Sequence, residues 1–169
     1  MTYTSAQANK LLKKLNDEHA ALLDKENRSK DFRAAMGEDV ESVRPVYDYA
    51  DTQKKLAELE QRIRKVKHAI NVFNATHVIP DFGMTIDEML VYIPQLTQRK
   101  NKLADMKARL PKQRVDEQYG RQSNIIDYSY ANYDLAAVET DYEKVSDELS
   151  RAQLALDAVN QRDTFELAE

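Results

Sequence analysis

The sequence predicts an all-α fold, an antiparallel bundle of long helices whose contact stripes resemble those of coiled coils. Strong helix formers dominate a chain of 169 residues that has only three glycines and four prolines. Apolar side chains also recur every three or four residues over long stretches, which is the spacing of one helix face. We expect a single domain over residues 1–169, with helices at about 5–26, 47–77, 86–110 and 133–162.

A capping box predicts the start of the first helix, at about 5–26. Thr4 can accept a hydrogen bond from the backbone of Gln7 while the Gln7 side chain reaches back to Thr4. His19 shares the apolar face of this helix, which carries Leu11, Leu12, Leu15, Leu22 and Leu23. Residues 27–46 lose the pattern, so we expect a polar connector that can hold a helical turn around Phe32 to Met36.

The second helix, over 47–77, has the clearest apolar pattern. Its stripe steps by three and four without a break through Tyr49, Thr52, Leu56, Leu59, Ile63, Val66, Ile70, Phe73 and His77. Such a stripe is a heptad seam, which needs another helix to cover it. We expect the first and third helices, or other subunits, to supply that cover.

A second capping box, Thr85 with Glu88, predicts a third helix that runs to about Leu110 and stops at Pro111. Pro94 lies inside this helix. Because proline removes one backbone hydrogen bond, we expect it to kink the helix or to split it near Tyr92.

An irregular excursion, residues 111–133, precedes the last helix. Segments Arg114–Tyr119 and Ile125–Tyr130 can pair as a short β-hairpin, because residues such as Ile125 and Tyr128 favour strands. The last helix, at about 133–162, carries another unbroken seam, made of Leu135, Val138, Tyr142, Val145, Leu149, Ala152, Leu156 and Val159.

Charge and composition narrow the function classes. Net charge is −4, with 32% charged residues of both signs, so we expect neither nucleic acid nor membrane as a partner. The basic run at 99–114 is answered by residues 134–169, which hold ten acids and three bases. No apolar run approaches the roughly 20 residues that span a bilayer, and Met1–Ala8 lacks the apolar core of a signal peptide. We expect a cytoplasmic protein.

Two groups of polar residues are candidate ligand-binding sites. Lys67, Asn71 and Asn74 share a stripe beside the second helix's seam, and Thr76 and His77 follow. The alternative is a solvated face whose cations suit the helix dipole. The second group comprises Arg114, Arg121, Tyr128 and Tyr130 of the excursion, with Arg99 nearby in sequence. Arginine with tyrosine suits phosphate pairing and base stacking, although the tyrosines can equally pack the loop onto the bundle.

Catalysis, metals and cofactors have little support in the sequence. Cysteine is absent, and there is neither a glycine-rich phosphate loop nor a nucleophile elbow. None of the three histidines has the Glu-x-x-His partner of a bundle metal site. We therefore expect no enzyme, no metal and no cofactor.

Three segments give the chain a resemblance to a group of small, uncharacterised, all-helical bacterial and phage proteins sometimes labelled septicolysin-like. They are Ile70-Asn71-x-x-Asn74-x-Thr76, Thr85–Leu90, and Leu156–Gln161 followed by Phe165–Leu167. The resemblance covers roughly residues 50–167. The group tends to have tryptophan near the final asparagine, whereas this chain has none. The resemblance implies an all-helical fold and interest in Asn71, Asn74 and Thr76; we do not carry over the toxin label.

These observations lead to two function hypotheses. The first is a non-enzymatic homo-oligomer that sequesters a small anionic, nucleotide-derived ligand, for example as a phage sponge against host immune signalling. The second is a structural or adaptor coiled-coil protein that acts through protein–protein assembly. A hydrolase is a more distant third.

Overall fold

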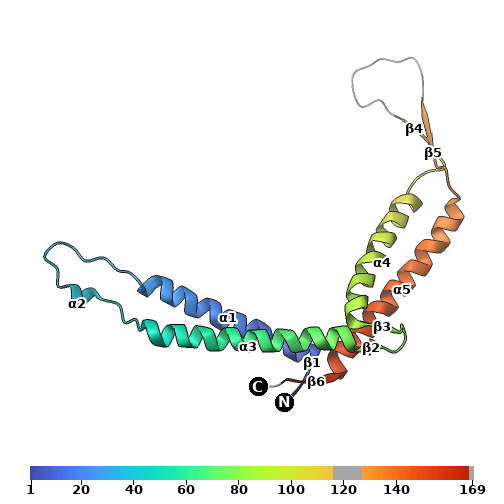
Figure 1. Ribbon diagram of the computed structural model, residues 1–169. Coiled ribbons are helices and arrows are strands. Elements are labelled where there is room, and N and C mark those ends of the chain that lie inside the picture. The colour runs from blue at the N-terminus through green and yellow to red at the C-terminus, as the bar shows by residue number, and fades with distance from the viewer. Residues whose placement is uncertain (116–126, 168–169) are drawn as a thin grey trace. The chain divides into compact units, whose positions relative to one another are not determined.

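The computed structural model describes residues 1–115 and 127–167, and the chain divides into two compact units (Figure 1). Unit 1 comprises Met1–His77 together with Ala158–Glu169, and unit 2 comprises Val78–Asp157. Helices dominate the described residues, and strands occur there as short antiparallel pairs. The predicted all-α class with a short β excursion is confirmed. The prediction of a single domain stays a prediction.

Two long antiparallel helices form unit 1, and we call them the α1/α3 hairpin. They are α1 (Ser5–Ser29) and α3 (Tyr49–Thr76). The Glu26 carboxylate, near the end of α1, accepts hydrogen bonds from Tyr47 at 2.6 Å and from Gln53 at 2.7 Å, near the start of α3. These bonds fix the antiparallel pairing at the connector end.

The connector between α1 and α3 contains one short helix, α2 (Val40–Val43). The helical turn predicted around Phe32 to Met36 is wrong, because residues 31–35 have no regular structure. The turn forms later because Asp39 can cap it. The Asp39 side chain accepts a hydrogen bond from the Glu41 backbone N–H at 3.2 Å.

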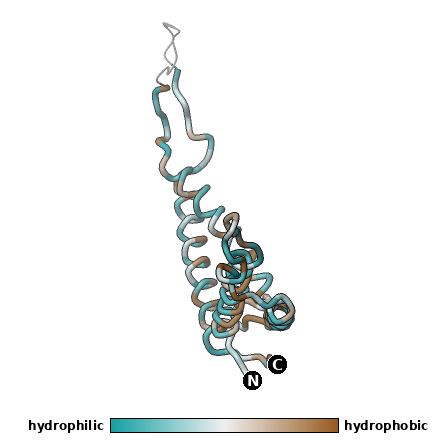
Figure 2. The backbone as a smooth tube through the Cα atoms, turned by 90° about the vertical axis from the view of Figure 1, so that its left-hand side faces the viewer, coloured by the Kyte–Doolittle hydropathy of each residue, from teal (hydrophilic) through white to brown (hydrophobic). Residues whose placement is uncertain are grey.

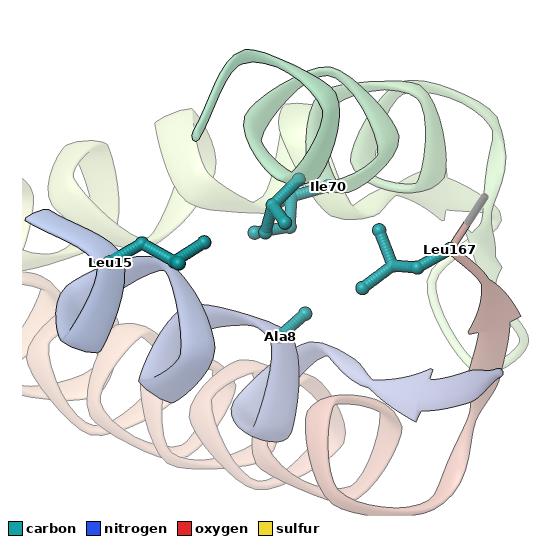
Figure 3. Packing of buried hydrophobic residues seen from close by; sticks show 5 residues of the cluster. Ala8, Leu15, Ile70 and Leu167 are labelled. Atoms are coloured by element: carbon teal, nitrogen blue, oxygen red, sulfur yellow. The ribbon is translucent and has the colours of Figure 1, made fainter. Parts of the chain in front are cut away.

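The core of unit 1 joins α1, α3 and the C-terminal segment. Ala8, Leu15, Val66, Ile70 and Leu167 form its buried cluster, and the labelled side chains point toward one another in Figure 3. Half-buried side chains surround this cluster, among them Leu11, Leu12, Leu59, Ile63 and Phe165. The seam predicted on α3 is therefore covered in part within the chain: Leu56, Val66 and Ile70 are buried, whereas Leu59 and Ile63 are half-buried.

A strand pair closes unit 1 by joining the two ends of the chain. Strand β1 (Thr2–Thr4) pairs antiparallel with β6 (Thr164–Glu166), with Tyr3 opposite Phe165. The backbone N–H of Leu167 donates to the Met1 carbonyl at 3.0 Å. No pattern in the sequence predicts this strand pair.

Both predicted capping boxes form. Thr4 Oγ1 accepts from the Gln7 backbone N–H at 3.2 Å, and the Thr4 N–H donates back to the Gln7 side chain at 3.0 Å. Thr85 and Glu88 make the same reciprocal pair at 3.2 and 2.7 Å. Each capping box gives hydrogen-bond partners to two backbone N–H groups at the first turn of a long helix. The box therefore fixes where the helix starts.

Unit 2 begins with a tight hairpin of strands β2 (Val78–Ile79) and β3 (Met84–Thr85). Gly83 adopts a φ of 62° in its turn, a conformation that costs glycine little. The N–H of Gly83 donates to the Ile79 carbonyl at 3.0 Å. From the sequence, this segment was expected only to end the preceding helix.

Two antiparallel helices continue unit 2: α4 (Ile86–Lys107) and the part of α5 (Leu135–Arg162) that precedes Ala158. Tyr92 donates to Glu148 at 2.5 Å near the start of α4, and Lys107 pairs with Glu139 at 2.9 Å near its end. The covered face of α4 includes Ile86, Met89 and Leu96.

Helix α4 runs through Pro94 without interruption, so the predicted split near Tyr92 is wrong. Proline at this position deprives the Leu90 carbonyl of its helical donor. The Leu90 side chain is 47% exposed, so that side of the helix faces solvent. Water can therefore satisfy the freed carbonyl, and the helix tolerates the missing bond.

The excursion before α5 contains the short strands β4 (Lys112–Arg114) and β5 (Tyr128–Tyr130). The two strands are antiparallel to each other, and Arg114 lies opposite Tyr128. Of the predicted hairpin of Arg114–Tyr119 with Ile125–Tyr130, the part from Arg114 to Val115 and from Asp127 to Tyr130 is paired, and the first strand begins earlier, at Lys112. Residues 116–126 lie outside the described part of the chain. Figure 2 shows hydrophilic and hydrophobic residues alternating along the helices, as their seams require.

Candidate functional site

The predicted site at the end of α3 is occupied by packing within unit 1. His77 caps α3, and its backbone N–H donates to the Phe73 carbonyl at 2.9 Å. Its ring stacks on Phe73, which in turn stacks on Phe165; both centroid distances are 4.6 Å. Its Nε2 lies 2.6 Å from Asp163 Oδ2. These contacts make His77 a clamp between α3 and the C-terminal segment.

The other predicted residues of α3 differ in their surroundings. Lys67 and Asn71 are exposed, as a solvated face requires. Thr76 donates its hydroxyl to the Val72 carbonyl at 2.8 Å, which is a bond within the helix. Asn74 is half-buried, and its Oδ1 is buried without a hydrogen-bond partner among the described residues. Of this group, Asn74 alone has a buried side-chain polar atom without a hydrogen-bond partner.

The predicted residues of the excursion that the structure describes come together on one hairpin. Tyr128 and Tyr130 are exposed on β5, and Arg114 lies opposite Tyr128. The Lys112 ammonium sits 4.1 Å from the ring centroid of Tyr128 and 5.5 Å from that of Tyr130. Arg121 lies outside the described residues. The hairpin therefore places the Lys112 cation over two tyrosine rings, whereas the sequence pointed to Arg114 and Arg121 as the cations of this segment.

A shallow hollow of about 280 Å³ lies beside this hairpin. Tyr133 helps to close it, because its hydroxyl donates to the Met106 carbonyl at 2.8 Å. Side chains from the end of α4 and from both strands line it: Met106, Arg109, Leu110, Gln113, Ser129, Tyr130, Ala131 and Tyr133. Sequence analysis missed Arg109 and Gln113, whose place beside Tyr130 depends on the register of the strand pair.

The basic run on α4 is partly neutralised, as the sequence suggested. Lys107 pairs with Glu139, and this carboxylate raises the pKa of the Lys107 ammonium, chiefly through their hydrogen bond. Lys107 and Lys100 also lie over the Tyr142 ring, at 5.2 and 5.8 Å. Arg99 is exposed on α4. Helix α5 therefore supplies partners for Lys100 and Lys107 of α4 within unit 2.

The most extended feature of unit 1 is a groove along one side of the α1/α3 hairpin, which we call the α1/α3 groove. It consists of three adjoining hollows of about 360, 310 and 170 Å³. The first and second share Arg62, and the second and third share Leu22 and Lys55. Leucine and valine form its floor: Leu11, Leu15, Leu22, Leu59 and Val66.

Charged side chains of α3 form one rim of the α1/α3 groove at helical spacing. They are Asp48, Asp51, Lys55, Glu58, Arg62 and Lys65. Lys55 pairs with Asp51 at 2.6 Å, whereas Arg62 and Lys65 have no ion-pair partner in residues 1–115 and 127–167. Sequence analysis missed this rim. Its signal was charge at the positions that flank a heptad seam, the places where coiled coils choose their partners.

Tyr47 closes the connector end of the groove, and its phenol should ionise late. Its hydrogen bond to the Glu26 carboxylate raises the pKa of Tyr47 to about 12, above the usual 10. This bond contributes stability that is fully present below pH 10 and is lost as pH rises through the folded pKa. Absorbance at 295 nm should show a late-titrating tyrosine that disappears in Tyr47→Phe. The variant necessarily loses the absorbance change of one tyrosine, and a loss that falls near pH 10 and not near pH 12 would contradict the assignment.

In the described part of the chain, no group of three or more histidine, aspartate or glutamate side chains is placed to hold a metal ion. No helix formed by those residues is both long and apolar enough to cross a membrane.

Comparison with known proteins adds information on the fold. No family model and no curated protein sequence matches the chain. One similar solved structure is the crystal structure of a functionally unknown conserved protein from Corynebacterium diphtheriae, with a TM-score of 0.60. The match covers 98% of this chain and 100% of that chain at 16% identity. At this identity the likeness shows a shared fold alone, and the septicolysin-like resemblance stays a prediction.

Proposed function

We propose that the chain is a non-enzymatic protein that acts by assembling with protein chains through its helical hairpins. The observation that carries the proposal is how little of each helix in unit 1 is covered. Helix α1 buries three residues out of 25 and α3 buries four out of 28, although both carry apolar seams. A two-helix pair covers one narrow stripe, whereas the seams of bundle helices are usually covered by two or more neighbours.

The uncovered part of these seams is continuous. Leu11, Leu22 and Leu59 remain half-buried, and all three line the α1/α3 groove. Burying such side chains stabilises an assembly by roughly 25 cal/mol for each Å² of apolar surface removed from water. The structural or adaptor hypothesis therefore has the stronger physical support.

The proposal can be tested on the tagged full-length chain, purified gently from the cells that naturally produce it. We expect size-exclusion chromatography with light scattering to give a mass well above the 19.5 kDa of one chain, from further copies or from another protein. A particle of 19.5 kDa in fresh extract at native abundance would contradict the proposal.

Sequestration of a small anionic ligand is a second candidate function, and the β4–β5 hairpin favours it. Lys112, Tyr128 and Tyr130 put a cation and two exposed rings beside the hollow that Arg109 lines. Phosphate oxygens could pair with the cations while a base stacks on a tyrosine ring. A nucleotide-derived signal would suit these groups, and an oligomeric phage sponge against host immune signalling is one biological form of this activity.

A thermal-shift series with mono-, di- and cyclic nucleotides tests the second candidate. At about 100 times Kd, a ligand should raise Tm by roughly 5–10 °C. Lys112→Ala should abolish most of this shift by removing the cation above the rings. Lys102→Ala is the matched control, because Lys102 is an exposed lysine of α4 that does not line the hollow. No shift with any nucleotide, or equal losses in both variants, would count against ligand binding.

A further inference from the structure

The α1/α3 groove has the dimensions of a docking site for a helix. From Leu11 to Ser29, residues of α1 that line it, the groove extends about 27 Å at about 1.5 Å per residue. The floor is apolar and the rims are charged, which is how amphipathic helices are recognised in grooves.

The charges along the α3 rim select the occupant of this groove. Read from Asp48 through Asp51, Lys55, Glu58 and Arg62 to Lys65, their signs are minus, minus, plus, minus, plus, plus. Reversing the helix and exchanging the signs gives the same series. The rim is therefore complementary to its own reversed copy.

We propose that the α1/α3 groove docks the same groove of a second copy of this chain, with the two α3 helices antiparallel. Under one two-fold axis, Lys65 faces Asp48 of the second copy, Arg62 faces Asp51, and Glu58 faces Lys55. Each contact occurs twice, since a two-fold interface is self-complementary. The product is a four-helix bundle that buries the half-exposed leucines of both floors.

The α1 rim agrees with the same axis. Within unit 1, His19 of α1 lies opposite Glu60 of α3, at 3.4 Å, and Glu26 lies opposite Gln53. The axis passes between Lys55 and Glu58 on α3, so on α1 it passes close to Leu22. Glu18 and Lys25, which line the groove on either side of that position, carry opposite charges.

This inference rests on the proposed function, and charge exchange in the purified full-length chain tests it. We expect the wild type to dimerise in sedimentation equilibrium. Arg62→Glu and Asp51→Arg should each weaken the dimer about tenfold, since each turns two attractions into repulsions. The double variant should restore the Kd to within about threefold of wild type. Arg64→Glu, on the opposite face of α3, is the matched control and should change the Kd by less than about twofold.

Disulfide trapping tests which residues face each other, and it does not depend on how strongly the charges of the α3 rim attract. The chain has no cysteine of its own, so mixed Arg62→Cys and Asp51→Cys variants should cross-link to each other under mild oxidation. A mixture of Arg64→Cys and Asp51→Cys should not. Circular dichroism must first show that each variant keeps the helix content of the wild type.

The possible failures are distinguishable. A pure chain that stays monomeric at roughly 0.1 mM, or a dimer that ignores both single charge exchanges, overturns the inference. If the chain from its natural cells is nevertheless part of a larger particle, the proposed function stands and the groove holds a different protein. If that particle is also absent, both proposals fail.

Discussion

Replacing Leu15 by alanine is expected to lower the free energy of unfolding by about 3–5 kcal/mol. The Leu15 side chain is 2% exposed and belongs to the cluster of Ala8, Val66, Ile70 and Leu167. Alanine would leave a cavity between α1 and α3, and these helices have few other buried contacts that could share the loss. Urea unfolding followed by circular dichroism at 222 nm, at fixed protein concentration, measures the change.

Leu23→Ala is the matched control for Leu15→Ala. Leu23 lies on the same helix, but its side chain is 39% exposed, so we expect a cost below about 1 kcal/mol. Equal costs for the two variants would mean that the cluster in Figure 3 does not stabilise unit 1.

Local chemistry accounts for the part of the fold that the sequence predicted. Thr4 and Thr85 mark two helix starts because their capping partners lie three residues away in the chain. The seam residues Leu56, Val66, Ile70 and Phe73 are buried as the three-four spacing predicted. On α5, the seam residues Val138, Val145 and Leu149 are buried for the same reason.

Contacts between distant segments account for what sequence analysis missed. Strand β1 finds β6 across the whole length of the chain, and no local pattern in Thr2–Thr4 specifies that partner. Likewise, spacing placed His77 correctly on the α3 seam, but it could not reveal that Asp163 and Phe73 engage its ring. A helix face can be read from one sequence, whereas the segment that covers it cannot.

The candidate site divides in the same way. The rim charges of α3 are regular in sequence, but Asp48 and Lys65 become the ends of one groove only when α1 supplies its other wall. In the sequence, Lys112 is one member of a basic run; in the structure, the pairing of β4 with β5 places its ammonium over the Tyr128 ring. In both cases the residue types were visible in the sequence, and tertiary pairing decided which of them act together.

The last strand should prove to be as important to unit 1 as the long helices. Phe165 stacks on Phe73 at 4.6 Å, and Leu167, 6% exposed, enters the core cluster from the C-terminal segment. We expect Phe165→Ala with Leu167→Ala to cost about 4–6 kcal/mol together, because both large side chains are truncated in one contact region.

The two faces of this strand supply an internal control. Successive side chains of a strand point to opposite sides, so Thr164 and Glu166, both exposed, leave the core untouched when both are changed to alanine. We expect that double variant to unfold within about 1 kcal/mol of wild type. If the two double variants were equally stable, the C-terminal segment would contribute nothing to the stability of the α1/α3 hairpin. The larger loss predicted for Phe165 and Leu167 follows because the α1/α3 pair alone buries too narrow a stripe to complete a core.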